Sequence, residues 1–181
     1  LGIAVAGGTG VVGRHVVDVA RERGHRPAVL ARSEGVDLLG GVGLVARLEG
    51  VDAVLTSFRP GDFAMRQQDE LIPMRHGVIG QETQGPGGFM MSLRSVQVFQ
   101  GLIADLDDVA PGARIFNYTN PVNIVSQAVE DHTDTPIYSM CEGPMIFWPS
   151  ILRTAGLDPE RAEVIMAGVN HNCWSTTHLY D

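Results

Sequence analysis

The sequence predicts an α/β protein with a Rossmann-type, doubly wound parallel sheet, followed by the start of a truncated second α+β domain. Two observations carry this prediction. Short apolar segments bounded by glycine or polar clusters alternate with helical segments, and a glycine-rich loop stands between the first strand and the first helix. We expect a nucleotide-binding domain over residues 1–158 and an incomplete second domain over residues 159–181.

The elements follow in chain order. Strands are expected at six short apolar runs, over residues 3–6, 27–31, 53–56, 113–117, 137–140 and 164–167. Helices are expected over residues 11–23, 42–48, 89–106, 122–131 and 145–154, with glycines after Arg23 and Ala155 as stop signals. Residues 59–88 are rich in glycine and proline and lack a clean period, which predicts a functional loop.

The first strand leads into a loop that fits G-x-G-x-x-G from Gly8 to Gly13 and opens the first helix. Small residues let the backbone approach a pyrophosphate, and the helix N-terminus supplies amide donors. The loop therefore predicts dinucleotide binding. The candidate cofactor contacts in it and after the third strand are Gly8, Thr9, Gly10, Val11, Gly13, Ser57 and Arg59.

Arg32 follows the second strand, where an NAD-dependent dehydrogenase usually places an acidic residue. An arginine there suits the 2′-phosphate of NADP, but it can equally be a solvated surface side chain. The choice between NAD and NADP stays open.

Ligands of parallel sheets bind outside the carboxyl ends of the strands. The segments that follow the later expected strands are polar, and we expect them to collect at one edge of the sheet. They include residues 57–61, 119–121, 141–144 and 170–171. Cys141 and His171 could meet there and offer sulfur and nitrogen to a divalent ion, although a buried thiol and an ordinary histidine are the alternative.

Composition excludes several classes of protein. A net charge of -8 argues against nucleic acid as a partner. All 13 basic residues are arginines, so mechanisms that need a lysine are excluded. No apolar run is long enough to span a membrane and no signal peptide is evident, so we expect a cytoplasmic protein with reduced cysteines. The chain begins without methionine, and we expect both of its ends to be cut.

From residue 56 to residue 181 the order of motifs resembles glycoside hydrolase family 4, which includes 6-phospho-glucosidases and α-galactosidases. The resemblance rests on residues 57–61, 66–73, 77–83, 85–88 and 117–121, on Cys141 and on residues 168–171. It implies hydrolysis of glycosides, such as 6-phospho-glycosides, with NAD and a divalent metal. In that chemistry the sugar is oxidised at its third carbon, the aglycone is eliminated, water adds and the hydride returns, which departs from the scheme with two carboxylates.

The resemblance also implies roles for single residues. Cys141 and His171 would bind the metal, which is usually manganese. Arg66, Asn120 and Asn170 would contact the substrate, Arg66 through the phosphate of a phospho-sugar, although it could instead pair with Asp69 or Glu70. Glu82 would raise the basicity of the catalytic tyrosine, and Glu142 would protonate the leaving oxygen.

The resemblance fails at two places. Residues 6–32 resemble NAD(P)-binding proteins of the NmrA and short-chain-dehydrogenase type, so the chain could be a chimera joined near residues 51–56. The family's catalytic tyrosine lies beyond residue 181, so the chain would be an N-terminal fragment without its general base. The resemblance implies a homo-oligomer for the full-length protein.

Two other functions remain open. Residues 120–125 resemble the lactate and malate dehydrogenases, which favours a 2-hydroxy-acid dehydrogenase. The front segment favours an NmrA-like protein that senses NAD(P) without catalysis. Only the glycosidase predicts manganese bound through Cys141 and His171, so metal binding discriminates among the three.

Overall fold

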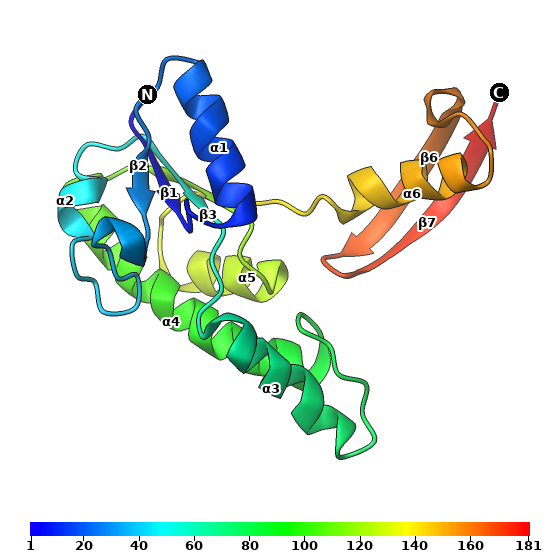
Figure 1. Cartoon of the computed structure of the whole chain (residues 1–181), viewed down its shortest axis with the longest axis horizontal. Helices are drawn as coiled ribbons and strands as arrows, with labels where there is room; N and C mark the ends of the chain where they lie inside the picture. Colours follow the sequence, from blue (N-terminus) through cyan, green and yellow to red (C-terminus); the bar gives the residue numbers. More distant parts are fainter. The chain divides into compact units, whose positions relative to one another are not determined.

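Five parallel strands form the sheet of the first of two units in the computed structural model, which describes all 181 residues (Figure 1). The units are Leu1–Met140 and Cys141–Asp181. The sheet order is β2-β1-β3-β4-β5, with β1 (Ile3–Ala6), β2 (Ala28–Leu30), β3 (Ala53–Thr56), β4 (Arg114–Asn117) and β5 (Ile137–Ser139). The expected parallel sheet is confirmed for these five strands.

Helices cover both faces of this sheet. Helix α1 (Val11–Glu22) buries Val17 and Ala20 and packs against β1. The opposite face carries the main hydrophobic core, in which Ala4, Val54 and Ile115 of the strands meet side chains from three helices. These are α2 (Val45–Leu48), α4 (Gly85–Val109) and α5 (Val122–His132). Helices on opposite faces make the sheet doubly wound, as expected.

The strand order places a topological switch point at β1. The chain leaves β1 towards β2 on one side, and β3 returns to pair with β1 on the other side. The loops after β1 and β3 therefore diverge in direction and open a crevice at the carboxyl ends of the strands. The fold positions a ligand site at this crevice.

The segment expected to be a long functional loop is partly helical. Helix α3 (Asp62–Met74) lies within residues 59–88, so the prediction of a loop was wrong there. The helix buries Asp69 and Pro73 and exposes Phe63 and Met74, so its sequence lacks the apolar stripe that identifies a surface helix. Helix α2 is shorter than expected because Gly41 and Gly43 adopt positive φ angles before it.

The second unit contains helix α6 (Gly143–Thr154), the short 3₁₀ helix η2 (Pro159–Arg161) and an antiparallel hairpin of β6 (Ala162–Val169) and β7 (Asn172–Tyr180). Another short 3₁₀ helix, η1 (Arg32–Glu34), follows β2 in the first unit. The sixth expected strand is β6, which pairs with β7 in a separate two-stranded sheet. Asn170 and His171 form a two-residue turn, His171 with φ 57°, and a turn this short can only reverse the chain.

The boundary between the units lies at Met140–Cys141, earlier than the boundary expected at residues 158–159, because α6 packs with η2 of the second unit. No helix of the structure is long and apolar enough to cross a membrane.

Candidate functional site

A cavity of about 410 Å³ opens at the carboxyl ends of β1, β2 and β3. Its walls come from the glycine loop after β1, from the segment after β2 and from the segment after β3. The lining residues that carry the argument below are Gly7, Thr9, Arg32, Asp37, Ser57 and Arg59. The cavity lies at the switch point, where an open parallel sheet binds its ligand.

Glycine is required in two positions of the loop by direct contact. A Cβ atom on Gly7 would lie 2.0 Å from the carbonyl oxygen of Ser57, and Gly7 has a φ of +82°. A Cβ on Gly13 would lie 2.2 Å from the carbonyl oxygen of Gly7. Both glycines let the loop close against β3 and α1. The backbone can therefore approach a pyrophosphate at the N-terminus of α1.

The other loop residues divide into two groups. Thr9 and Gly10 line the cavity, as do Ser57 and Arg59 on the facing wall. Gly8 is packed behind the loop, where a Cβ would lie 2.9 Å from a methyl group of Val29. Val11 is 86% exposed and does not line the cavity. The structure thus brings together at the cavity only some of the residues expected to bind the cofactor. Gly8 and Gly13 instead allow the loop to pack closely against its neighbours.

Arg32 and Asp37 stand together on the wall that follows β2. Arg32 Nε lies 3.8 Å from Asp37 Oδ1, and both side chains line the cavity. Asp37 was missed by sequence reasoning, which considered only the residue directly after the strand. The sequence did contain a signal for an acidic residue on this wall, because Asp37 follows Arg32 and Glu34 in the same loop.

Buried polar side chains fix the ends of β3 and β4. Thr56 Oγ1 donates to Asn117 Oδ1 at 2.8 Å, and the backbone N–H of Thr119 donates to the same oxygen at 2.7 Å. Asn117 Nδ2 donates to Ser139 Oγ at 3.2 Å, which links β4 to β5. Because unpaired polar groups are costly in a core, this satisfied network gives the strand ends one arrangement.

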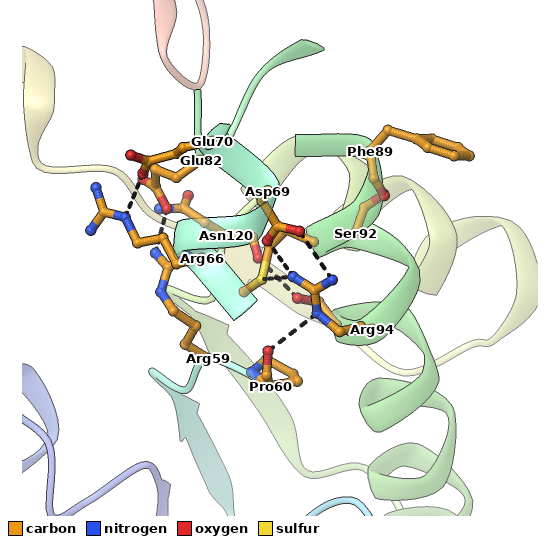
Figure 2. A network of polar contacts seen from close by, with 12 residues as sticks. Arg59, Pro60, Arg66, Asp69, Glu70, Glu82, Phe89, Ser92, Arg94 and Asn120 are labelled. Atoms are coloured by element: carbon orange, nitrogen blue, oxygen red, sulfur yellow. Dashed lines mark hydrogen bonds and ion pairs between the residues drawn. The ribbon is translucent and has the colours of Figure 1, made fainter. Parts of the chain in front are cut away.

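A cluster of charged side chains lies beside the loop after β3 (Figure 2). Arg59 pairs with Glu82, and both are largely buried. Arg66 Nε donates to Glu70 Oε1 at 2.7 Å on α3. Arg66 therefore makes the ion pair with Glu70 that the sequence left as an alternative to a substrate contact.

Electrostatics in this cluster keep Glu82 ionised. Burial by itself raises the pKa of Glu82, but the adjacent Thr83 side chain, the hydrogen bond and charge of Arg59 and the charge of Arg66 outweigh it and lower the pKa below its ordinary value. The hydrogen bond to Glu70, opposed by burial and supported by the charge of Glu82, raises the pKa of Arg66. Glu82 is thus a fixed carboxylate acceptor.

A second ion pair joins α3 to α4. Arg94 of α4 binds the carboxylate of Asp69 through both terminal nitrogens, and its Nε donates to the carbonyl oxygen of Pro60 at 3.3 Å (Figure 2). Asp69 is almost fully buried. Pro60 lines the cavity next to Arg59, so Arg94 also holds the wall of the cavity. Sequence reasoning missed this pair because nothing local in the chain links residues 69 and 94.

Asn120 follows β4 and carries an unused acceptor. Its Oδ1 atom is buried and has no hydrogen-bond partner, whereas its backbone carbonyl accepts from Ser95 Oγ at 3.0 Å. A buried acceptor without a partner costs free energy unless a ligand supplies a donor. The amide oxygen is therefore suited to a hydroxyl group of a ligand.

The second unit holds the remaining expected residues. Cys141 is half-buried with a free thiol, Glu142 is exposed before α6, and Asn170 and His171 form the turn of the β6–β7 hairpin. No group of three or more His, Cys, Asp or Glu side chains that could hold a metal ion is gathered in the structure. The roles of these four residues stay predictions.

A sequence model described as "Family 4 glycosyl hydrolase" matches residues 43–155. A probable 6-phospho-beta-glucosidase of Bacillus subtilis (strain 168) is 36% identical over 125 residues, which cover 68% of this chain and 28% of that protein. The 6-phospho-alpha-glucosidase 1 of Lacticaseibacillus paracasei is 34% identical over 168 residues, covering 88% of this chain and 38% of that protein. The chain thus spans well under half the length of these relatives.

Solved structures share the fold. A 6-phospho-alpha-glucosidase from gut microorganisms, in complex with NAD and Mn²⁺, matches with a TM-score of 0.79 at 24% identity, covering 99% of this chain and 47% of that one. A 6-phospho-beta glucosidase from Thermotoga maritima, with NAD and glucose-6-phosphate, matches with a TM-score of 0.75 at 21% identity, covering 99% and 49%. A lactate dehydrogenase from Eimeria maxima matches with a TM-score of 0.55 at 14% identity, covering 91% and 51%.

Proposed function

The chain belongs to family 4 of the glycosyl hydrolases, and from this membership we propose that it forms the dinucleotide-binding part of an NAD- and metal-dependent glycosidase. We propose 6-phospho-glycosides as the substrate class, because the named relatives are 6-phospho-glucosidases. The observation that carries the proposal is the cavity at the β1/β3 switch point, one wall of which, residues 57–61, lies inside the matched segment. Family membership favours this function over a hydroxy-acid dehydrogenase and over an NAD(P)-sensing protein.

The cavity fits a dinucleotide on its own geometry. A Cβ on Gly7 or Gly13 would collide with backbone, so glycine lets the loop close there. Thr9 and Gly10 line the cavity at the N-terminus of α1, which would supply amide donors to a pyrophosphate. When bound, NAD would supply reversible oxidation of the sugar at its third carbon, while a divalent metal would polarise the sugar hydroxyl groups. Thr9, Gly10, Ser57 and Arg59 would hold and orient the dinucleotide.

We assign substrate contacts to the cluster beside this cavity. Arg66 keeps donors beyond the Nε that binds Glu70, and a guanidinium suits the phosphate of a phospho-sugar. Asn120 Oδ1 would accept from a sugar hydroxyl, which would satisfy its unused acceptor. Glu82, kept ionised by its surroundings, would strengthen a neighbouring base by accepting a hydrogen bond.

The second unit would supply the metal ligands and an acid. Cys141 as a thiolate and His171 through a ring nitrogen are donors that bind divalent transition metals. Two such donors do not complete a coordination shell, so sugar oxygens or water would fill the other positions. Glu142, next to Cys141 in sequence, would protonate the leaving oxygen, and Asn170 would contact the substrate. A homo-oligomeric enzyme stays a prediction.

Manganese binding tests the proposal, because Cys141 has a matched control in Cys173. Both cysteines are free and half-buried in the same unit, but only Cys141 is assigned to the metal. We expect Cys141→Ser to weaken manganese binding by roughly tenfold or more, since even the loss of a residue that merely supports a ligand costs that much. Cys173→Ser should bind manganese as the unmodified chain does. Calorimetric titration with MnCl₂, with and without NAD, gives the affinities.

Equal manganese affinity in the two serine variants would reject Cys141 as a ligand. NAD binding that manganese does not alter, combined with absent metal binding by the unmodified chain, would argue against the glycosidase.

A further inference from the structure

We propose that Arg94 is a positioning residue for the bound dinucleotide. It fixes the turn from Arg59 to Asp62 in the cavity wall, and through that turn it fixes the guanidinium of Arg59. This inference rests on the proposed function, because it needs a dinucleotide in the cavity. Arg94 itself lies on α4 and is not among the residues that line the cavity, so its effect on a ligand is indirect.

The segment that Arg94 contacts is a tight turn, and residues 59–62 all line the cavity. The backbone N–H of Asp62 donates to the carbonyl oxygen of Arg59 at 3.2 Å, and Gly61 between them has φ 88° and ψ 1°. Proline at the second position and a left-handed glycine at the third are typical of a type II turn. Asp62 also has a positive φ, of 54°, which residues with a side chain rarely adopt. Contacts from the surroundings must therefore hold the turn in this conformation.

Arg94 supplies a contact that the turn does not make by itself. The internal hydrogen bond of the turn uses the carbonyl of Arg59, so the carbonyl of Pro60 is left for a partner outside the turn. Arg94 Nε donates to that oxygen at 3.3 Å (Figure 2). Its two terminal nitrogens bind the buried carboxylate of Asp69, with Nη1 and Oδ1 3.2 Å apart. Because all three nitrogens of a planar guanidinium are engaged, the direction of the donor to Pro60 is fixed.

Arg59 carries a donor that the folded chain leaves unused. Its Nη2 pairs with Glu82, whereas its Nη1 is buried and has no hydrogen-bond partner. A buried donor without a partner costs free energy unless a ligand supplies an acceptor. Arg59 lines the cavity, and a phosphate oxygen of a dinucleotide is an acceptor of the right charge for it. Since Arg59 begins the turn, a shift of the turn would move this donor relative to the phosphate.

Arg94→Lys separates the two contacts of Arg94. A lysine ammonium can still pair with Asp69, but a lysine side chain has only carbon where Nε stands, so the hydrogen bond to Pro60 is lost. We expect calorimetric titration of the 181-residue chain with NAD to show binding weakened by roughly tenfold or more, because the charge-assisted hydrogen bond from Arg59 is misplaced. Arg75→Lys, at an exposed position after α3, is the matched control and should bind NAD as the unmodified chain does.

Two further variants show whether Arg94 acts through Arg59. In an Arg59→Lys background, Arg94→Lys should weaken NAD binding no further, because the donor that it positions is already absent. Asp69→Asn should lose more stability in urea than Arg94→Lys but less NAD affinity. Asparagine still accepts a hydrogen bond from Arg94 and so leaves the contact with Pro60 in place. A merely structural role of Arg94 predicts the reverse order, with affinity falling in step with stability.

The outcomes that contradict the inference are distinct from those that contradict the proposed function. Equal NAD affinity of Arg94→Lys and the unmodified chain would overturn the inference alone. Additive losses in the double variant would also overturn it, because Arg94 would then not act through Arg59. If Arg94→Lys does not unfold cooperatively, Arg94→Gln, whose amide can still donate to Asp69, replaces it in each comparison with the same expected results. If the unmodified chain binds no NAD, the proposed function and the inference both fail.

Discussion

Glu82 is the residue whose ionisation the fold controls most clearly. Burial raises its pKa, but Arg59, Arg66 and the adjacent Thr83 side chain together lower it below the ordinary value. A carboxylate whose pKa is lower in the folded than in the unfolded state adds stability at pH values above its unfolded pKa, about 4.3 for glutamate. This stability is lost as the pH falls through the folded pKa.

We therefore expect acid to destabilise the unmodified chain more than the Glu82→Gln variant. The free energy of unfolding, measured in urea from pH 7 to pH 3, should fall more steeply for the unmodified chain at the acid end. The exposed Glu130→Gln on α5 serves as the control and should follow the unmodified chain. Parallel curves for Glu82→Gln and the unmodified chain would refute the ion pair as a source of stability.

Residues of the candidate site differ in how far the sequence could predict them. The glycine loop was predictable because a tight turn before a helix requires glycine at fixed spacing, and the contacts of Gly7 and Gly13 explain that requirement. Arg94 was not predicted, because only the tertiary fold brings its partner Asp69 close. Asp37 was overlooked although it follows Arg32 in the same loop. The pairing of Arg66 with Glu70 could be foreseen as an alternative, since the two are one helical turn apart.

At the scale of elements, α3 and α4 are held together by charge as well as by packing. Asp69 is almost fully buried, and its carboxylate faces Arg94. Removing one partner of a buried pair leaves the other charge uncompensated, which typically costs 3–5 kcal/mol. The pair also holds Pro60 at the cavity wall, so its loss would disturb more than the two helices.

We expect Asp69→Asn to lower the free energy of unfolding by about 3 kcal/mol. Asp18→Asn is the matched control, because Asp18 pairs with Arg21 on α1 with both side chains more than half exposed. An exposed pair of this kind contributes about 1 kcal/mol or less. Urea unfolding at pH 7 measures both. Equal losses in the two variants would mean that the α3–α4 pair contributes no more than a surface contact.

The type and bounds of a helix or strand could be predicted from the sequence where the burial of apolar side chains alone determines them. Strands β1, β3 and β4 lie inside the sheet and bury apolar side chains such as Val5, Val54 and Ile115, and their expected bounds agree with the structure to within a residue. Helix α3 was missed because it buries a charged residue and exposes Phe63. The partner of strand β6 was not predicted, because an apolar run does not reveal which strand it pairs with. The two-residue turn at Asn170–His171 decides that β6 pairs with β7.

At the scale of the whole molecule, the two units differ in how much they bury. The first unit has a core in which Val5, Leu102 and Ile115 are fully buried. In the second unit only Gly143 and Pro159 are buried, while Phe147 and Trp174 are mostly exposed. A two-stranded hairpin without a hydrophobic core is only marginally stable in water. The stability of the chain therefore resides in residues 1–140.

Amide hydrogen exchange should separate the two units. We expect the amides of β1 and β3 to exchange roughly a hundredfold or more slowly than those of β6 and β7, because core strands open only with global unfolding. Mass spectrometry of peptides from both units at pH 7 gives the rates. Comparable protection of β3 and β7 would show that the second unit is stabilised to the same degree as the first.

The parallel order of the sheet also affects how the chain reaches its folded state. Ile3 pairs with Ala53, and Ala53 in turn pairs with Arg114, so the two central pairings each close a long stretch of chain. Long closures cost entropy before the contacts repay it, which makes sheets of this kind slow to form. During synthesis β3 stays without its second neighbour until α4 has been made. The exposed edge of β3 is then the point at which a nascent chain would be most prone to aggregate.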